Sequence, residues 1–200
     1  MALGGCVQQQ PYDYTKLLES KPVSILVIPP LNNSIEVDAP YVYLSTVSKP
    51  LAEKGYYVFP VAVVDRFLKE NGLQTPADMH DVPIDKLVEH IGPDAILYAS
   101  IEEWGQKYQV ISSSAIVRAK VRLIDARSGE LLWDGTSQAV QSSGDGGAGL
   151  TGALVSALVT QVINSTMVDP TYRLSKQANT QLFNNKINGL LDGPYKEAKN

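Results

Sequence analysis

The stretch VRAKVRLIDARSGELLW, residues 117–133, decides the fold. In its first half apolar and cationic residues alternate, and a period of two places them on opposite faces of a β-strand. One face carries Val117, Ala119, Val121 and Leu123, and the other carries Arg118, Lys120 and Arg122. Residues 125–130 predict a turn, in which Gly129 supplies a positive φ. Residues 131–140 then return as the partner strand of an antiparallel hairpin.

Apolar runs upstream of the hairpin predict the rest of the sheet. They lie at residues 24–28, 56–60 and 95–102. Helical patterns separate them at residues 38–54, at 63–71, and over 75–90 as one or two short helices. Gly55 is placed as the residue that ends the first helix, and Pro50 predicts a kink in that helix or its division into two segments.

Downstream, residues 144–149 form a glycine-rich loop, 150–164 predict a helix, and 172–185 are polar and competent to form another. The predicted order β-α-β-α-α-β-β-β-α gives an α/β fold, a single-domain layered sandwich with a mixed sheet and a C-terminal helical segment. We expect a lipobox remnant and flexible tether at residues 1–22, the α/β domain at 23–168, and a C-terminal helical extension and tail at 169–200.

Composition excludes several classes of protein. The 200 residues carry 17 Lys and Arg against 21 Asp and Glu, a net charge of −4, with no basic run that would favour nucleic-acid binding. One Cys excludes an intrachain disulfide and a multi-cysteine metal site, and with two His residues a zinc site would need carboxylates to complete its ligands. We therefore expect no metal and no nucleic-acid partner.

The amino terminus carries the clearest targeting signal. Leu3-Gly4-Gly5-Cys6 resembles the lipobox of bacterial lipoproteins, which makes Cys6 the acylated residue and the membrane the partner of its acyl chains. Met1 is then an artificial start or the stub of a removed signal peptide. The tether at residues 7–22 would reach at most about 50 Å. Val7, where an Asp would signal retention in the inner membrane, favours the outer membrane by analogy.

No sequence pattern supports catalysis. Residues 144–149 match G-x-G-x-x-G, but the preceding strand belongs to a hairpin and no strand follows the next helix, so a dinucleotide site is disfavoured. Asp78, His80 and Asp81 lack a nucleophile or metal in evident reach. We expect no catalytic residues and no cofactor.

Two surfaces are candidates for protein contacts. In the predicted helix over 150–164, the side opposite the apolar stripe carries Gly152, Ser156 and Thr160, small and uncharged where a solvent-facing helix would carry Lys or Glu. Either residues 172–185 cover this side, or it mediates self-association, with a homodimer expected. The row of Arg118, Lys120 and Arg122 is either the solvated face of the sheet or a strand that faces an acidic partner.

Residues 123–133 resemble a strand, Asp, turn, Gly-Glu, strand, Trp signature found in several bacterial envelope lipoproteins. These include the curli-secretion-channel lipoproteins and the lipoprotein activators of penicillin-binding proteins; the amino-terminal domain of the Tol-system propeller protein has a similar fold. Residues 55–61, 70–73 and 92–98 resemble more closely a family typified by a neisserial surface lipoprotein antigen. That likeness spans residues 22–165 and implies an α/β domain on a lipid anchor, with no catalytic residues.

These observations favour a lipid-anchored protein of the bacterial outer membrane, with its domain in the periplasm or at the cell surface. It would act as an interaction module in envelope transport or secretion assembly, with other envelope proteins as partners. A regulator of cell-wall synthesis and a small-ligand binding protein remain alternatives.

Overall fold

Six strands build one mixed sheet in the structure, a computed structural model that describes residues 11–108, 113–143 and 170–196. The strands are β1 (Ser24–Val27), β2 (Leu31–Asn32), β3 (Tyr57–Val58), β4 (Ala95–Tyr108), β5 (Ser113–Asp125) and β6 (Leu131–Ser143). Their order is β3-β1-β4-β5-β6, and β2 also pairs with β4. The pairs of β1 with β3, β1 with β4 and β2 with β4 are parallel, whereas β4, β5 and β6 are antiparallel. The predicted mixed sheet and α/β class are confirmed.

The predicted hairpin is the β5–β6 pair. Its alternating apolar side chains, Val117, Ala119, Val121 and Leu123, are all buried, as the period of two requires. At the turn the Asp125 amide donates to the Glu130 carbonyl at 2.8 Å, and Gly129 has a φ of +73°. Strands β4, β5 and β6 are each 13 or 14 residues long, so the sheet extends well beyond the predicted strand ends.

Six helices lie in the described part of the chain. They are α1 (Thr15–Ser20), α2 (Ala39–Glu53), α3 (Val61–Glu70), α4 (Pro76–His80), α5 (Ile84–His90) and α6 (Pro170–Phe183). Helix α2 is one helix rather than two segments. Pro50 lies in its last turn, where a missing amide removes only one hydrogen bond. Gly55 follows with a φ of +88°, as predicted.

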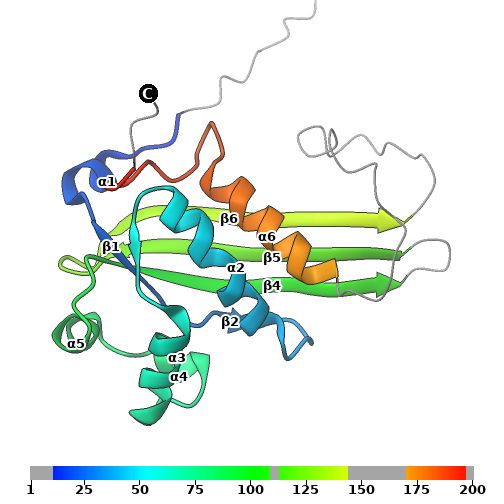
Figure 1. Cartoon of the computed structure of the whole chain (residues 1–200), viewed down its shortest axis with the longest axis horizontal. Coiled ribbons are helices and arrows are strands. Elements are labelled where there is room, and N and C mark those ends of the chain that lie inside the picture. The colour runs from blue at the N-terminus through cyan, green and yellow to red at the C-terminus, as the bar shows by residue number, and fades with distance from the viewer. Residues whose placement is uncertain (1–10, 109–112, 144–169, 197–200) are drawn as a thin grey trace, which may run out of the picture.

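The helices cover the sheet in two layers (Figure 1). Helices α2 and α6 pack on one face, over a large core that includes Tyr43, Trp133 and Phe183. Helices α3, α4 and α5 cover the other face near β1 with a smaller core around Met79 and Leu87. Among the described residues, no helix covers much of the same face of β4, β5 and β6. No helix among the described residues is both long and apolar enough to cross a bilayer.

Both ends of the described chain join the domain, in contrast to the predicted tether and C-terminal extension. Leu17 of α1 is buried in the larger core, and so are Leu174, Ala178 and Leu182 of α6. After α6 the chain returns to the end of α2, where the Gly193 amide donates to the Lys54 carbonyl at 2.7 Å. The α/β domain therefore needs residues on both sides of the predicted 23–168 boundary.

Candidate functional site

Of the residues proposed for lipidation or for protein contacts, only the cationic row on β5 lies within the described part of the chain. Cys6, the glycine-rich loop at 144–149, and Gly152, Ser156 and Thr160 lie outside it. Arg118, Lys120 and Arg122 project from the face of the sheet that the described helices leave open, with Arg118 partly buried and the other two exposed.

Acidic side chains from β4 pair with this row. The Arg118 guanidinium lies 2.8 Å from the Glu103 carboxylate, and the Lys120 ammonium lies 3.6 Å from that of Glu102. A register shift between Ile101 and Glu103 brings both acids to this region of the strand. The open face is thus a mosaic of opposite charges rather than a basic patch. Such a surface suits a polar protein contact, and each exposed ion pair adds at most about 1 kcal/mol.

The N-terminal segment is held against the edge of the sheet at β6. The Tyr12 hydroxyl donates to the Asp134 carboxylate at 2.7 Å and accepts from the Asp134 amide at 2.8 Å. Burial, and then the hydrogen bond to this carboxylate, raise the pKa of Tyr12 to about 12. Tyr14 donates to the Gly189 carbonyl at 2.6 Å. Two tyrosines therefore fasten the start of the described chain to elements far away in the sequence.

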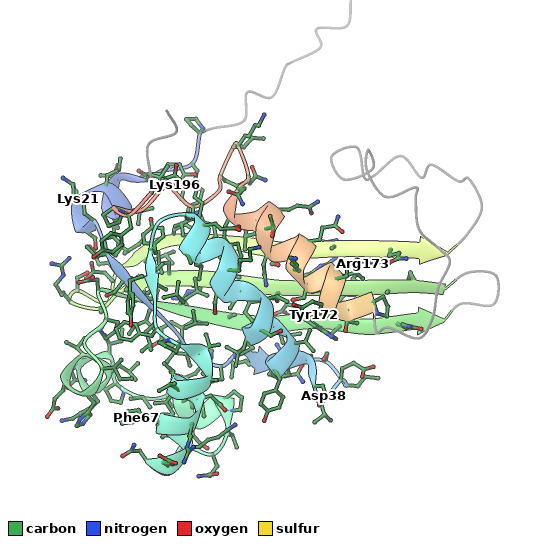
Figure 2. All side chains as sticks on the ribbon, in the orientation of Figure 1. Lys21, Asp38, Phe67, Tyr172, Arg173 and Lys196 are labelled. Atoms are coloured by element: carbon green, nitrogen blue, oxygen red, sulfur yellow. The ribbon has the colours of Figure 1, made fainter. Side chains whose placement is uncertain are left out.

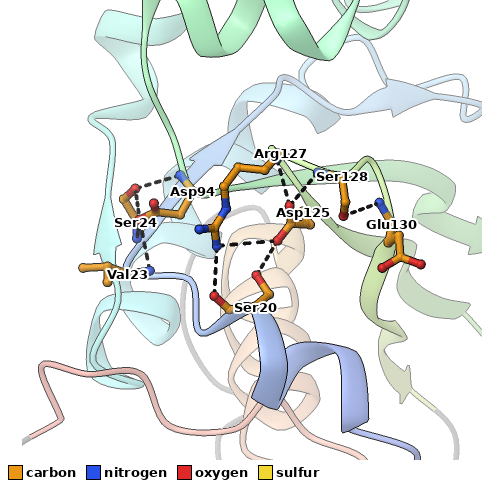
Figure 3. Close-up of polar contacts among 8 residues, drawn as sticks. All are labelled: Ser20, Val23, Ser24, Asp94, Asp125, Arg127, Ser128 and Glu130. Carbon is orange, nitrogen blue, oxygen red and sulfur yellow. Dashed lines mark hydrogen bonds and ion pairs between the residues drawn. The ribbon is translucent and has the colours of Figure 1, made fainter.

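The hairpin turn holds the end of α1 (Figure 3). Asp125 is buried, and its carboxylate accepts the backbone amides of Arg127 and Ser128, each at 2.8 Å, and the Ser20 hydroxyl. The Arg127 guanidinium donates to the Ser20 carbonyl at 3.0 Å. Burial alone would raise the pKa of Asp125, but the hydrogen bonds from Ser20, Ser128 and Arg127 lower it below its ordinary value.

A second carboxylate, that of Asp94, accepts hydrogen bonds at the same end of the molecule (Figure 3). Asp94 accepts the amides of Val23 and Ser24 at 3.1 and 2.9 Å, and the Ser24 hydroxyl at 2.8 Å. These bonds hold the first residues of β1 beside the first residues of β4. Asp94 and Asp125 thus hold contacts between segments of the domain.

A buried polar network joins α2, α6 and β6. The Asn179 side chain accepts from the Ser137 hydroxyl at 2.8 Å and donates to the Thr46 hydroxyl at 3.1 Å. Thr46 and Ser175 hydroxyls lie 2.7 Å apart. All four residues are buried. These bonds supply the polar partners that burial requires and fix the position of α6 on the sheet.

Two shallow grooves lie on the surface. One of about 250 Å³ runs between α1 and residues 191–194 and has mainly apolar walls. They include Leu17, Leu18, Pro22, Tyr56, Leu191 and Pro194. The other, of about 280 Å³, lies between α2 and α6 and is lined mostly by polar and charged residues, which include Ser45, Lys49 and Lys176.

No catalytic constellation appears in the described residues. No group of three or more His, Cys, Asp or Glu side chains among them could hold a metal ion. The ring of His80 bonds the Pro29 carbonyl at 2.9 Å and stacks edge-on against Tyr98. Burial lowers the pKa of His80, with the hydrogen bond to Pro29 acting in the opposite direction. This histidine therefore has a packing role.

Sequence reasoning missed the docking of the N-terminal segment and the buried network of α6. A signal existed for the network, because Thr171, Ser175 and Asn179 repeat every four residues and mark one polar but uncharged side of a helix. The contact between Tyr12 and Asp134 spans 122 positions, and no local pattern announces it.

Comparison with known proteins bears on the family. A family model described as "Putative lipoprotein GNA1162-like" matches residues 12–195. A lipoprotein of Neisseria meningitidis serogroup B, described as "Putative lipoprotein NMB1124/NMB1162", is 46% identical over 197 residues, which cover 97% of this chain and 91% of that protein. The family inferred from the sequence is confirmed, and the match includes both docked ends of the domain.

A solved structure of a close relative in sequence supports the fold. The crystal structure of lipoprotein GNA1162 from Neisseria meningitidis has 46% sequence identity and a TM-score of 0.59, and covers 72% of this chain and 100% of its own. The PelC dodecamer from Paraburkholderia phytofirmans has 14% identity and a TM-score of 0.44, and covers 86% of this chain and 90% of its own. The similarity to PelC is too low to support an argument about this chain.

Proposed function

The chain belongs to the family described as "Putative lipoprotein GNA1162-like", and from this premise we propose that it is an outer-membrane lipoprotein acylated at Cys6. Its α/β domain acts as a protein-interaction module in envelope transport or secretion assembly. The observation that carries the proposal is the lipobox-like Leu3-Gly4-Gly5-Cys6 at the start of a chain whose family is one of lipoproteins. Two or more acyl chains on one residue give a stable membrane anchor.

The N-terminal contacts support a short tether. Tyr12 is bonded to the sheet, so only the residues between Cys6 and Tyr12 remain to connect anchor and domain. Six residues reach at most about 20 Å. The domain would then act close to the membrane surface, on partners that also lie there.

The surfaces support contact with proteins rather than catalysis. Neither the description of the family nor that of its neisserial member names an enzymatic activity. The open face of the sheet presents Arg118, Lys120 and Arg122 beside Glu102 and Glu103, a pattern of charge that a partner of complementary pattern would recognise.

The anchor is tested by mass spectrometry of the protein extracted from its native cells. Acylated Cys6 in outer-membrane fractions is expected, and an unmodified thiol in material from the cytosol would refute the proposal. The interaction role is tested by crosslinking in intact cells with the native protein and with Cys6→Ser. Envelope proteins should be captured with the native protein and lost with the variant, whereas equal capture would remove the anchor from the function.

Self-association through Gly152, Ser156 and Thr160 forms part of the proposal. Sedimentation velocity at micromolar concentration should show a dimer, and Ser156→Glu should convert it to a monomer, because a carboxylate in a covered surface has no water to solvate it. A native protein that sediments as a monomer would remove this part of the proposal.

A further inference from the structure

We propose that the end of the domain formed by α1 and residues 186–196 is a membrane-docking face that lies on the bilayer surface while the anchor is inserted. This inference rests on the proposed acylation of Cys6. Three apolar or aromatic side chains stand out on this end: Leu18 is 57% exposed, Ile187 52% and Tyr195 65%. Aliphatic and tyrosine side chains with lysines beside them are typical of protein surfaces that rest at a membrane interface.

The face is continuous along the surface. Tyr14, at the start of α1, bonds Gly189, two residues from Ile187. The apolar groove of about 250 Å³ then runs between α1 and residues 191–194, directly before Tyr195. Figure 1 shows this C-terminal segment against α1. The three exposed side chains therefore belong to one end of the molecule.

Covalent geometry places this end at the membrane. Tyr12 is bonded to Asp134, and the six residues from Cys6 reach at most about 20 Å. Leu18 is six residues beyond Tyr12, and α1 begins at Thr15, so the two residues are at most about 15 Å apart. A short tether of this kind holds the face at high effective concentration next to the bilayer.

A rival apolar surface exists elsewhere and is less well placed. Ile35 is 93% exposed and Val37 80%, both more than Leu18. They flank Glu36, whose side chain lies against Gly105. Gly105 is two strands from β6, at the level of Val140 and six residues along the sheet from Asp134.

Six residues of strand and two strand spacings put the rival surface about 22 Å from Asp134, the whole reach of the tether. Figure 2 shows the same separation, with Lys21 and Lys196 at one end of the molecule and Asp38 far from both. The tether therefore favours the end formed by α1 and residues 186–196.

Charges on the docking face are mixed. On this face and directly beside it, the described residues include about as many carboxylates as lysines. The lysines are Lys16, Lys21, Lys186 and Lys196, and the carboxylates are Asp13, Glu19, Glu130 and Asp192. Docking should therefore depend on the apolar side chains, and raising the salt concentration should not release it.

The experiment uses Cys6 as the only cysteine of the chain. Unacylated protein is coupled through Cys6 to vesicles of phosphatidylethanolamine and phosphatidylglycerol that contain a little maleimide-functionalised lipid. The reference is protein with Cys6 blocked by N-ethylmaleimide, mixed with vesicles that lack the reactive lipid. Lysine acetylation by an amine-reactive ester is then followed residue by residue by mass spectrometry, at low and at high salt.

We expect acetylation of Lys21, Lys186 and Lys196 to slow several-fold on coupling, at both salt concentrations, while Lys86 and Lys120 react at the reference rate. Equal slowing of all five lysines, or none, would overturn the inference.

A pair of double variants identifies the surface. Leu18→Ser with Ile187→Ser should restore acetylation, whereas Ile35→Ser with Val37→Ser, the matched control, should leave the protection intact. The opposite result would assign docking to the rival surface. Because the maleimide link replaces the acyl anchor, this outcome is independent of native acylation, which the mass of Cys6 reports separately.

Discussion

Replacing Asn179 with Ala tests whether α6 is part of the domain or an extension of it. Asn179 is fully buried, and its side chain makes one hydrogen bond to Ser137 on β6 and one to Thr46 on α2. Alanine removes both bonds and leaves two buried hydroxyl groups with fewer partners, at about 1–3 kcal/mol for each. Thr46 keeps its bond to the Tyr43 carbonyl, so the lower half of the range applies to it. We expect a loss of about 3 kcal/mol in the free energy of unfolding.

Urea denaturation followed by circular dichroism measures this loss, and calorimetry should show a melting temperature lower by roughly 6–12 °C, at 2–4 °C per kcal/mol. The matched control is Asn184→Ala, one residue beyond α6. Asn184 is exposed and donates only to the Thr180 carbonyl, so its replacement should cost less than about 0.5 kcal/mol. If the two variants lose the same small amount, α6 does not help to hold the domain together, and the assignment of residues 170–196 to the core is wrong.

Three further predictions concern the ends of the domain. Asp125→Asn should destabilise the protein at neutral pH and approach the native protein in stability at low pH. The charge-dependent stabilisation is fully present above the ordinary pKa of 3.8 and is lost as the pH falls through the lowered pKa of this carboxyl; a difference that stays constant in urea titrations across pH would contradict it. Tyr12→Phe loses both hydrogen bonds to β6 and should speed amide exchange in α1 with at most about 2 kcal/mol of global loss; unchanged exchange would refute the docking. Gly55→Ala places a Cβ against the backbone nitrogen of Lys196 and should expose the Tyr195 amide to exchange, because that amide donates to the Gly55 carbonyl. Gly72→Ala has an equally positive φ but open space and should leave the Tyr195 amide protected; equal exchange in the two variants would show that backbone strain alone is responsible.

The hairpin could be predicted from the sequence because its signal is local. Alternation from Val117 to Leu123 fixes the inner face of β5, and the turn from Asp125 to Glu130 fixes the partner strand. For the same reason helices α2 and α3 are predicted to within two residues, and α4 and α5 lie inside the range 75–90 that is expected to hold one or two short helices. At α4, Thr75 and Asp78 form a capping box whose two bonds join residues three positions apart.

The two ends of the domain could not be predicted because their contacts join distant positions. Residues 11–22 are polar and carry one buried leucine, Leu17, so composition favours a tether. What docks them is a set of single hydrogen bonds to partners more than 100 positions away, at Asp125 and Asp134. The buried side of helix α6 includes Ser175 and Asn179 beside Leu and Ala side chains, so its sequence resembles that of an exposed polar helix. Their burial is explained only by the hydrogen-bond partner at Thr46, which is distant in the sequence.

The distinctive residues of the signature at 123–133 make structural contacts within the domain. Each of its distinctive side chains is occupied inside the domain by an element from one of the two chain ends. Asp125 accepts from Ser20, Glu130 pairs with Lys16 at 2.7 Å, and the buried Trp133 indole donates to the Asn188 carbonyl at 2.9 Å. A substitution in this motif should therefore loosen α1 and the segment after α6 before it affects any partner. Since α1 and residues 186–196 form the proposed docking face, the motif acts on function by shaping the end of the domain nearest the anchor.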